Sequence, residues 1–446
     1  MQNPDAFFAT FEQQLPATLA QLQALDIETL ARQASFLQRT PRKIPMRQFL
    51  QGLLAVAPET DLSLEHIASV IGLAAQTTYT KQALAERLEH DVKTFLARVI
   101  TAWLSHQAEA IPLMPALASF ARVLVQDSTV EKLPPHLADL FPGSGNQHGQ
   151  DYASLKIQWI ADLKNSAVEH VSLSGFTRND QAAAPDILEI ARPGDLVLRD
   201  LGYFTVAVLA KLARQKIAFL TRYRHGITLY DPVSGQPLDL VAELKLHHSL
   251  DRSVLLGPAR APVRLVALPV PEEVANLRRY RAKTSAQRRG RSLPGAEHLC
   301  LMGWNLFVTN VPATTWPPKT LVAIYRLRWR IEVIFKTWKS HLGLRRLNCR
   351  TPVLLQLSVL TKLVFCAVVC QLCDVLELRC PTEEHVSLLR LGHILGQCAC
   401  WFSATVLGLS VTQWIQFCLT HHSLYEKRKD RKNFYQLAAA AANAQA

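Results

Sequence analysis

The sequence predicts an α/β protein: a mixed sheet with helices on its faces, interrupted by a β-rich insertion and flanked by helical regions at both ends. Three observations support this fold class. Apolar residues recur at helical period through residues 1–118, and short strand-like apolar runs begin at about residue 119. The helical period returns after residue 316. A chain of 446 residues that is 49% hydrophobic can bury a large core and has room for two or three domains.

The N-terminal region, residues 1–118, shows helix-turn-helix spacing within residues 61–88. A short helix capped near Ser63 is followed by a break around Gly72 and by a second helix that begins near Thr80. Many small helical bundles share this layout, so a bundle without DNA contact is the alternative. We favour a DNA-binding region whose second helix presents three polar side chains to a groove: Lys81, Gln82 and Arg87.

Residues 119–224 are predicted to form the first part of a core. Two strands carry carboxylates at their ends, because "ARVLVQDST" ends in Asp127 and "GDLVLRDLGYF" carries Asp200. Two further strands, "LKIQWIADL" and "AVEHVSLSG", lie between them, and a helix at about 203–215 and the strand "KIAFLTRYR" follow. This order of elements is typical of a ribonuclease H-like core, which we expect to resume in residues 316–350.

Residues 225–315 interrupt this core with short β-like runs, "VRLVALPV" and "LCLMGWNLFVTNVP", separated by proline and glycine. The same stretch holds the most basic segment of the chain, residues 277–292, with seven arginines or lysines and one tyrosine. This segment is either an exposed loop or an arm that becomes ordered when it binds phosphates. The second interpretation agrees better with the charge of the chain.

Residues 324–344, "IYRLRWRIEVIFKTWKSHLGL", are predicted to form one amphipathic helix. At about 100° per residue, four polar side chains fall within about 60° of one another, opposite an apolar stripe: Tyr325, Arg328, Glu332 and Lys339. A solvated face with an ion pair between Arg328 and Glu332 would give the same pattern. The rest of the chain therefore decides whether this face carries chemistry.

Residues 351–446 read as a helical C-terminal region with a basic tail, "YEKRKDRKNFYQ". Residues 353–373 approach the length of a membrane span, but Gln356, Lys362 and Gln371 interrupt them, so we expect a buried helix. All nine cysteines lie in the last third of the chain, in apolar helix-like text, which favours buried thiols over a metal cluster. The first residues lack a basic segment followed by an apolar one, so we expect a cytoplasmic protein.

Three carboxylates form the candidate catalytic and metal-binding set: Asp127, Asp200 and Glu332. Either aspartate alone is most simply a turn former or a helix N-cap. Together with Glu332 they supply oxygen ligands for two hard divalent cations, which support an in-line phosphoryl transfer. Lysine and arginine outnumber aspartate and glutamate by 49 to 36, a net charge of +13, which favours nucleic acid as the partner.

At these residues the chain resembles the DDE transposases of bacterial insertion sequences in the insertion-sequence-four group. The YREK signature of that family has the spacing Y-x2-R-x3-E-x6-K, which is reproduced in full by Tyr325, Arg328, Glu332 and Lys339. Further similarities are "QDST", "DLGYF" followed by "TRYR", "PRKIPMRQFL" and "GWNLFVTNVP". The resemblance covers nearly the whole chain and is clearest over residues 35–345.

The resemblance implies a ribonuclease H-like core that works as a homodimer on paired transposon ends, with Mg2+ as cofactor and Mn2+ able to replace it. It implies that double-stranded DNA is cut at the ends of the element and that the freed 3′-hydroxyl is joined to target DNA, in some members through a hairpin. The side chains implied to contact DNA are Tyr325, Arg328, Lys339 and Trp304. Trp304 would stack on a flipped-out base; the alternative for Trp304 is an ordinary core or interface residue.

Alternatives to a DNA transposase remain open. A metal-dependent endonuclease on the same fold would cleave without joining and would use the same three carboxylates. A non-catalytic DNA-binding regulator would use the N-terminal region, and its acidic residues would be structural. A membrane-surface protein is disfavoured, because no basic amphipathic helix concentrates its cations on one face.

Overall fold

The computed structural model describes most of the chain between residues 24 and 399. The described residues are 24–38, 44–59, 62–75, 77–88, 91–105, 115–143, 152–164, 167–344, 347, 349, 351–377 and 385–399. They divide into two compact units: the first takes in residues 1–112, 128–178 and 330–433, and the second takes in residues 113–127, 179–329 and 434–446. The predicted basic tail lies outside the described residues.

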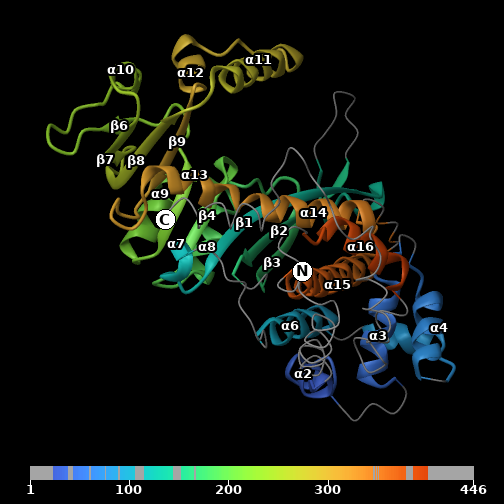
Figure 1. The fold of residues 1–446 in the computed structure, drawn as a ribbon. Helices are drawn as coiled ribbons and strands as arrows, with labels where there is room; N and C mark the ends of the chain where they lie inside the picture. Colours follow the sequence, from blue (N-terminus) through green and yellow to red (C-terminus); the bar gives the residue numbers. More distant parts are fainter. Residues whose placement is uncertain are drawn as a thin grey trace, which may run out of the picture. The chain divides into compact units, whose positions relative to one another are not determined.

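The second unit is built on a sheet of parallel and antiparallel strands (Figure 1). Three strands are parallel neighbours: the first half of β1 (Val123–Leu133), β4 (Leu196–Arg199) and β5 (Ala218–Arg222). Four more continue the sheet with antiparallel pairing, in the order β9 (Trp304–Thr309), β8 (Ala261–Pro269), β7 (Leu250–Leu256) and β6 (Leu229–Tyr230). All four residues of β4 are buried, as expected for a parallel strand covered on both faces. The predicted α/β class is confirmed.

The helices of the second unit cover this sheet and lie at its ends. α9 (Val206–Arg214) connects β4 to β5 and buries Val208, Leu209 and Leu212, so the helix and strand predicted after Asp200 are confirmed. The other helices of this unit are α7 (Pro115–Ala118), α8 (Ile187–Ile190), α10 (Leu240–Leu246), α11 (Glu272–Arg288), α12 (Ala296–Leu301) and α13 (Pro318–Arg326). In Figure 1, α10, α11 and α12 gather at one end of the antiparallel strands.

The basic segment at 277–292 is helical for most of its length, so the prediction of an exposed loop is wrong. The alternative, an arm that contacts phosphates, stays a prediction. α11 extends from Glu272 to Arg288. Most of its residues, which are arginine, alanine, lysine, glutamine and leucine, favour helix, and two glutamates in its first turn stabilise the positive end of the helix dipole. Charge alone was a poor guide to its backbone. Likewise, "LCLM" belongs mainly to α12, and the predicted strand begins only at Trp304.

In its described part, the N-terminal region is helical, as predicted. The helices of this region are α2 (Ile27–Gln33), α3 (Met46–Val56), α4 (Leu64–Ala75), α5 (Lys81–Leu88) and α6 (Val92–Ser105). Three aromatic rings join the segment after α2 to α3 and α6, because Phe36 stacks on Phe95 at 4.9 Å between ring centroids and lies 5.4 Å from Phe49. Such pairs add to the free energy gained by burying large apolar side chains.

The two helices of the predicted helix-turn-helix are α4 and α5. The Ser63 hydroxyl accepts a hydrogen bond from the His66 amide at 3.1 Å, so the predicted cap is confirmed. The Thr80 hydroxyl accepts one from the Ala83 amide at 3.2 Å, and the second helix begins there as predicted. The predicted break at Gly72 is wrong, since α4 continues to Ala75. A Cβ atom at Gly72 would lie 2.5 Å from the Thr77 carbonyl oxygen, so this glycine permits the chain to fold back closely after the helix.

The first unit also contains a β-hairpin. β2 (Ala153–Asp162) pairs antiparallel with β3 (Ala167–Gly175), and all ten residues of β2 are buried. Trp159 of β2 meets Trp338 of α14 (Trp329–His341) edge to face, with 4.6 Å between ring centroids. The hairpin therefore packs against the part of α14 that carries the end of the signature.

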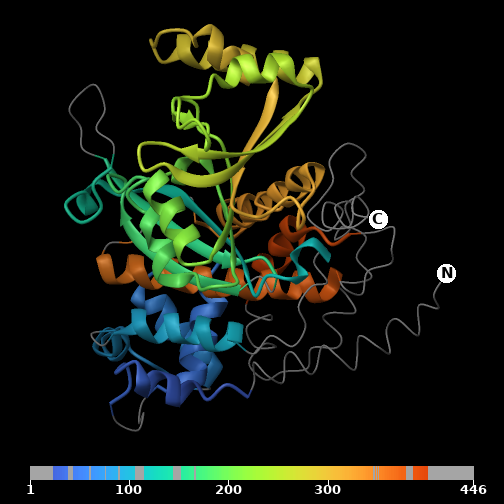
Figure 2. The ribbon, with the colours of Figure 1, turned by 90° about the vertical axis from the view of Figure 1, so that its left-hand side faces the viewer.

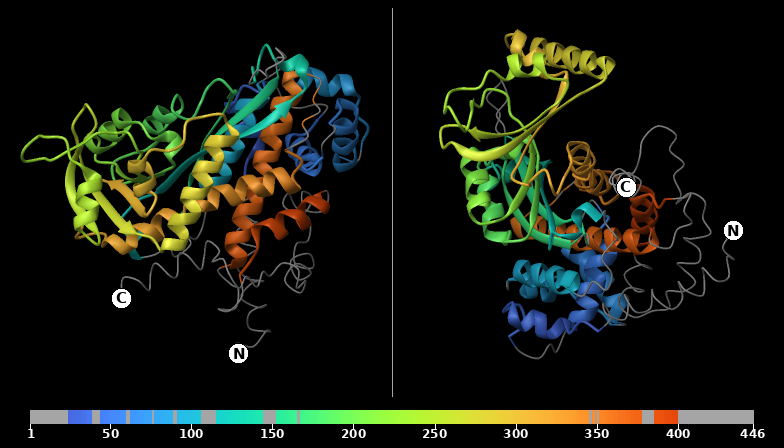
Figure 3. Two further views of the ribbon diagram at one scale, coloured as in Figure 1. Left: turned by 90° about the horizontal axis from the view of Figure 1, so that it is seen from above. Right: turned by 60° about the vertical axis from the view of Figure 1, so that its left-hand side comes forward.

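α15 (Pro352–Glu377) is the long helix of the first unit, and α16 (Leu388–Gln397) follows it. It is the single helix in the described part of the chain that is long and apolar enough to cross a membrane, and 83% of its most apolar window is buried. Figures 2 and 3 show it, in orange, alongside the blue N-terminal helices. Cys366, Cys370 and Cys373 are buried on it, and burial raises the pKa of the Cys366 and Cys373 thiols. The predicted buried helix is confirmed, and so are buried thiols at the cysteines that it carries. Cys300 and Cys398 are only half-buried, and the remaining predicted thiols, Cys380, Cys400 and Cys418, lie outside the described residues.

A buried lysine on α15 binds the end of α3. The Lys362 ammonium donates to the carbonyl oxygens of Ala57 and Glu59 at 2.5 and 2.6 Å. Only 2% of Lys362 is exposed, and this burial lowers its pKa from 10.5 to about 8. The sequence placed this lysine as an interruption of an apolar run, and the structure gives it hydrogen-bond partners.

This lysine predicts a pH dependence of stability. Between pH 8 and 10.5 the unfolded chain binds more protons at Lys362 than the folded chain does, so its contribution to the free energy of unfolding rises with pH, by at most about 3 kcal/mol. Urea unfolding at the two ends of this range should show a smaller rise for Lys362→Met than for the wild type. Lys336→Met, at an exposed position on α14, serves as the control and should keep the wild-type rise. Equal pH dependence in Lys362→Met and the wild type would contradict the assignment.

Candidate active site

Asp127 lies in the middle of β1, not at its end. The strand continues for six residues to Leu133, so the predicted strand end is wrong. From Asp127 onward, buried and more exposed positions largely alternate along the strand, which is the pattern of a strand with one covered face. The second half of β1, "STVEKL", is rich in polar residues, so the sequence did not indicate that the strand continues.

Asp200 directly follows β4, as predicted. It caps a short 3-10 turn at Leu201–Tyr203, where its carboxylate accepts a hydrogen bond from the Gly202 amide at 3.4 Å. The N-cap role that the sequence left as an alternative is therefore real. It does not exclude a second role, because a carboxylate has further lone pairs to offer.

The parallel register of β1 and β4 places the two aspartates side by side. Gln126 pairs with Arg199 across the two strands, and each is followed immediately by one of the aspartates. The side chains of these register partners are also bonded, because the Arg199 guanidinium donates to the Gln126 carbonyl oxygen at 2.7 Å. Gln126 in turn donates to the Ala183 carbonyl at 2.9 Å. Sequence reasoning missed this pair.

Arg199 is a buried cation in the core of the second unit. Its side chain is fully buried, and its Nη2 atom also donates to the Ala184 carbonyl at 2.8 Å. Among the described residues, its Nε and Nη1 atoms have no hydrogen-bond partner. Burial lowers the pKa of Arg199 to about 10. The arginine at the end of an otherwise apolar strand was the only sign of this network in the sequence.

Arg328 joins the two aspartates. Its guanidinium lies 3.4 Å from the Asp127 carboxylate and 3.8 Å from the Asp200 carboxylate. The Arg328 side chain is only 13% exposed, so both contacts form in a partly dehydrated setting where they are stronger than at the surface. Asp127, Asp200 and Arg328 are thus brought together within the second unit.

The predicted single helix at 324–344 is wrong, since a turn at Leu327 and Arg328 separates α13 from α14. The amides of Leu327 and Arg328 donate to the carbonyls of Ile324 and Tyr325, three residues back, so the helical ladder tightens and then stops. No proline or glycine marks this turn.

Tyr325 is buried, not on an exposed polar stripe. Only 6% of it is exposed, and its ring lies 5.4 Å from Phe307 and beneath the guanidinium groups of Arg222 and Arg328. Burial raises its pKa to about 12, so the hydroxyl stays protonated at neutral pH. It has no hydrogen-bond partner among the described residues. A buried, unsatisfied hydroxyl beside two arginines is available to a ligand oxygen.

Glu332 and Lys339 lie on α14 in the first unit, four and eleven residues after Arg328. Glu332 is half-buried in the first turn of α14. The Lys339 ammonium contacts the Glu131 carboxylate at 2.6 Å and donates to the Val130 carbonyl at 3.3 Å. Glu131, a nearly buried carboxylate in the second half of β1, is a partner that the sequence did not reveal.

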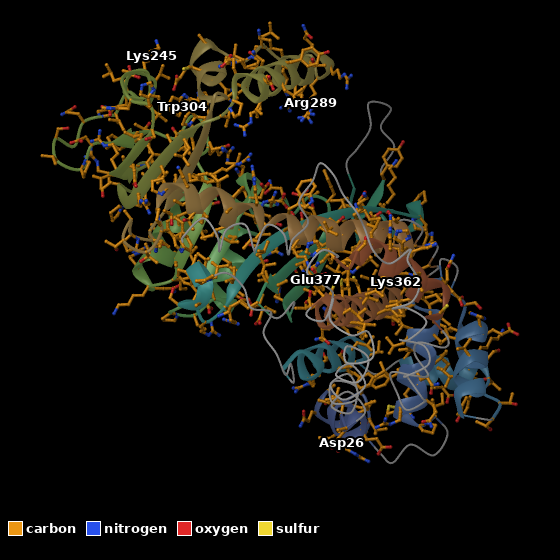
Figure 4. The ribbon with its side chains drawn as sticks, in the orientation of Figure 1. Asp26, Lys245, Arg289, Trp304, Lys362 and Glu377 are labelled. Atoms are coloured by element: carbon orange, nitrogen blue, oxygen red, sulfur yellow. The ribbon has the colours of Figure 1, made fainter. Side chains whose placement is uncertain are left out.

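Trp304 is the first residue of β9 and is half-buried. It pairs with Pro269 of β8, and its carbonyl accepts a hydrogen bond from Arg278 of α11 at 3.1 Å. Figure 4 shows Trp304 in the part of the second unit that holds α11 and α12. The contacts described for Trp304 are to β8 and α11.

The aspartates fit a hard divalent cation. They converge on one guanidinium, and their side chains are 19% and 41% exposed, so an ion from solution can approach them. Carboxylate oxygens are the ligands that Mg2+ prefers. Among the described residues, no group of three or more His, Cys, Asp or Glu side chains lies close enough to hold a metal ion. Glu332, the third predicted ligand, belongs to the first unit.

A comparison with protein families decides the identity of this arrangement. The family described as "Transposase DDE domain" matches residues 118–369, more than half of the chain, and the match includes all three candidate carboxylates. The chain belongs to the DDE transposase family. The resemblance to insertion-sequence transposases of this kind is confirmed.

Relatives of this DDE transposase family member come from several bacteria. The transposase for insertion sequence element IS231C of Bacillus thuringiensis subsp. berliner is 27% identical over 337 residues, 70% of each chain. The transposase for IS1151 of Clostridium perfringens is 24% identical over 340 residues, 71% of each chain. A putative transposase, InsL, for IS186A of Escherichia coli (strain K12) is 34% identical over 103 residues, 23% of this chain and 28% of the relative.

The Gln126–Arg199 pair predicts a specific stability effect. Gln126→Leu removes a partner from a fully buried guanidinium and should lower the free energy of unfolding by about 1–3 kcal/mol. Adding Arg199→Met to this variant removes the buried positive charge that Gln126→Leu leaves without that partner. The double variant should therefore lose clearly less free energy of unfolding than the sum of the two single losses. Urea unfolding of the four chains measures this coupling. Additive losses would show that the two side chains do not depend on each other.

Proposed function

We propose that this chain is a DNA transposase that cleaves the ends of an insertion sequence and transfers the freed 3′-hydroxyl to target DNA. One observation carries the proposal: in a member of the DDE transposase family, Asp127 and Asp200 directly follow two register partners of paired parallel strands and share one arginine. Neighbouring carboxylates held by a cation are suited to phosphoryl transfer chemistry, which relies on positioning and charge.

We infer that the catalytic core is ribonuclease H-like. The arrangement that supports this inference is the parallel set formed by the first half of β1, β4 and β5, with α9 crossing between β4 and β5. The β2–β3 hairpin of the first unit follows β1 in the chain, which is the order of elements expected for such a core. The inserted residues 225–315 and the helical regions at both ends, residues 1–118 and 351–446, complete the proposed domain division.

We propose that Asp127, Asp200 and Glu332 hold two Mg2+ ions, which Mn2+ can replace. Bound there, the metal would stabilise negative charge on the phosphate and lower the pKa of the attacking hydroxyl. Arg328 keeps the two aspartates together, so less conformational entropy is lost when they bind a cation. The buried Gln126–Arg199 bond fixes the strands behind them. Arg199 and Gln126 thus restrain the two strands, and Arg328 restrains the two aspartates.

The cations and the tyrosine of the signature are proposed to contact DNA. Arg328 can bind a phosphate in bidentate fashion, and the Tyr325 hydroxyl, protonated and without a partner among the described residues, can donate to a phosphate oxygen. Lys339 is held beside the strand that carries Asp127 and adds positive charge. Trp304 is proposed to stack on an unpaired base, with the core role as the alternative.

The proposed partners are double-stranded DNA, as the terminal repeats of the element and the target, and a second copy of the chain on paired ends. A net charge of +13 supports a polyanionic partner. We propose a cytoplasmic site of action, where the bacterial chromosome lies. An endonuclease that cuts without joining, and a regulator that binds without cutting, are the two outcomes that would replace this proposal.

The decisive experiment is cleavage of a labelled duplex that carries the terminal repeat of the element, with Mg2+ and with EDTA. Asp127→Asn and Glu332→Gln keep the size of each side chain but remove a metal-binding charge, so cleavage should fall at least about 100-fold. DNA binding should be retained, because less negative charge faces the phosphates. Glu189→Gln, which changes an exposed carboxylate on α8, is the matched control and should cleave like the wild type.

The outcomes separate the candidate functions. Cleavage followed by joining of the 3′-end to a second duplex supports a transposase, and cleavage without joining supports an endonuclease. Binding without metal-dependent cleavage in the wild type supports a regulator. Mn2+ titration of the uncut complex gives a second readout, since Asp127→Asn should weaken metal binding even when no product forms.

A further inference from the structure

α11 is a long helix with little packing of its own. It has 17 residues, and Ala275 is the single buried one. Helices of soluble proteins normally bury an apolar stripe, and that burial provides most of their stability. The composition of α11 therefore calls for an explanation other than core packing.

The inner side of α11 is held by small residues and two arginines. Ala275, Ala282 and Ala286 fall within about 40° on a helical wheel and are the least exposed part of the helix together with the arginines. Arg278 donates to the carbonyls of Met302 and Trp304 and to the Asn305 side chain, at 3.4, 3.1 and 2.9 Å.

The neighbouring Arg279 completes this attachment. It donates to the Leu299 carbonyl at 3.1 Å, and its Nη1 atom contacts Glu272 at 2.6 Å and Asn276 at 3.0 Å. Two of the seven cations in the basic segment are therefore used to fix α11 to α12 and to the start of β9. The helix is attached to the sheet by polar contacts, so its direction is fixed although its outer face is not packed.

The outer face of α11 combines exposed cations with exposed apolar surface. Leu277, Tyr280, Arg281 and Arg288 span about 100° of the helical wheel, and Leu277 and Tyr280 are 47% and 68% exposed. Five cations of the segment are exposed: Arg281, Lys283, Arg288, Arg289 and Arg291. Within the part of the chain that the structure describes, no carboxylate pairs with any of them.

The helix dipole explains only part of this pattern. Glu272 and Glu273 in the first turn and Arg288 in the last turn are placed as the dipole favours. Arg281 and Lys283 lie in the middle of the helix, where the dipole gives no such preference. The dipole also gives no reason for an exposed tyrosine and leucine beside them. A polyanionic ligand accounts for the cations, and a tyrosine hydroxyl can donate to a phosphate oxygen.

We propose that the outer face of α11 binds the phosphate backbone of duplex DNA. This proposal rests on the proposed function and adds a surface outside the signature to it. Arg281 and Arg288 are seven residues apart on one face, which places them about 10.5 Å apart along the helix axis, or about three steps of one DNA strand. The contact is to phosphates, so it strengthens binding without selecting a base sequence.

The attachment of α11 couples this surface to the start of β9. Arg278 donates a hydrogen bond to the carbonyl of Trp304, so α11 is bonded directly to the strand residue that is proposed to stack on a base. Phosphate contacts by α11 therefore position the duplex relative to Trp304. Arg278 itself is not part of the proposed surface, because its guanidinium is directed inward.

The test is the affinity of the full-length chain for a duplex of arbitrary sequence, measured in EDTA at salt concentrations from about 50 to 200 mM. Arg281→Gln/Arg288→Gln keeps good helix formers while removing two charges. We expect binding about ten-fold weaker or more, and a salt dependence reduced by about two in the slope of log affinity against log salt.

The matched control is Lys211→Gln/Arg214→Gln on α9, which removes two exposed charges from the other end of the strands in the same unit (Figure 1). It should keep the wild-type affinity and slope. Equal losses in both double variants would indicate a nonspecific effect of net charge and overturn the proposal. Unchanged affinity in the α11 variant would overturn it too, and would show a solvated face.

Failure of this proposal and failure of the proposed function are distinguishable. If the wild type binds and cleaves its terminal-repeat duplex but the α11 variant behaves like it, only the α11 surface is wrong. If the wild type binds no duplex at all, both proposals fail. Far-ultraviolet circular dichroism and the thermal midpoint of the variants show whether the helix and the fold are intact, and an Arg281→Lys/Arg288→Lys chain should restore most of the affinity.

Discussion

A hydrogen bond inside the sheet, from the Arg199 guanidinium to Gln126, holds the geometry on which the candidate site depends. The two side chains are register partners of β1 and β4, and the residue after each is a candidate metal ligand. A shift of one residue between the strands would separate the aspartates and would also leave a buried cation without a partner, which is costly. The buried pair and the site therefore favour the same register. Arg328 then draws the two carboxylates together from the side of the helices.

The sequence was sufficient for the α/β class, for the strands and helix around Asp200, and for the buried character of α15, because each rests on a clear hydrophobic period. The sequence-based prediction was wrong where a helix or strand continues through polar residues. β1 extends beyond Asp127 through polar residues that are more typical of a loop. α11 is a helix despite its high charge. The turn between α13 and α14 has no proline or glycine, so no local signal marks it. At β1 and at the turn after α13 the structure shows contacts between residues far apart in the chain, such as Lys339 with Glu131 and Arg328 with Asp127. In α11 the helix propensity of its residues outweighed the charge.

The candidate site shows the same division. The spacing of the signature identified Tyr325, Arg328, Glu332 and Lys339, but a helical wheel placed all four on one solvent-facing stripe. The structure instead buries Tyr325 against Phe307, pairs Arg328 with two aspartates and pairs Lys339 with Glu131. Three polar residues lie within strands: Gln126, Arg199 and Glu131. Their roles depend on strand pairing, which the sequence alone does not specify. The spacing of the signature identified its four residues, and their packing in the structure determines which contacts each can make.

The contact between Lys362 and the end of α3 links residues that are 305 positions apart. At about 5–20 residues per second, the ribosome completes Ala57 roughly 15–60 s before it adds Lys362. The N-terminal helices therefore have time to fold before the long apolar helix α15 is made. When α15 emerges, its buried ammonium has carbonyl partners already in place, and its apolar surface has helices to cover it. The order of synthesis thus shortens the time for which this membrane-like segment is exposed to aggregation.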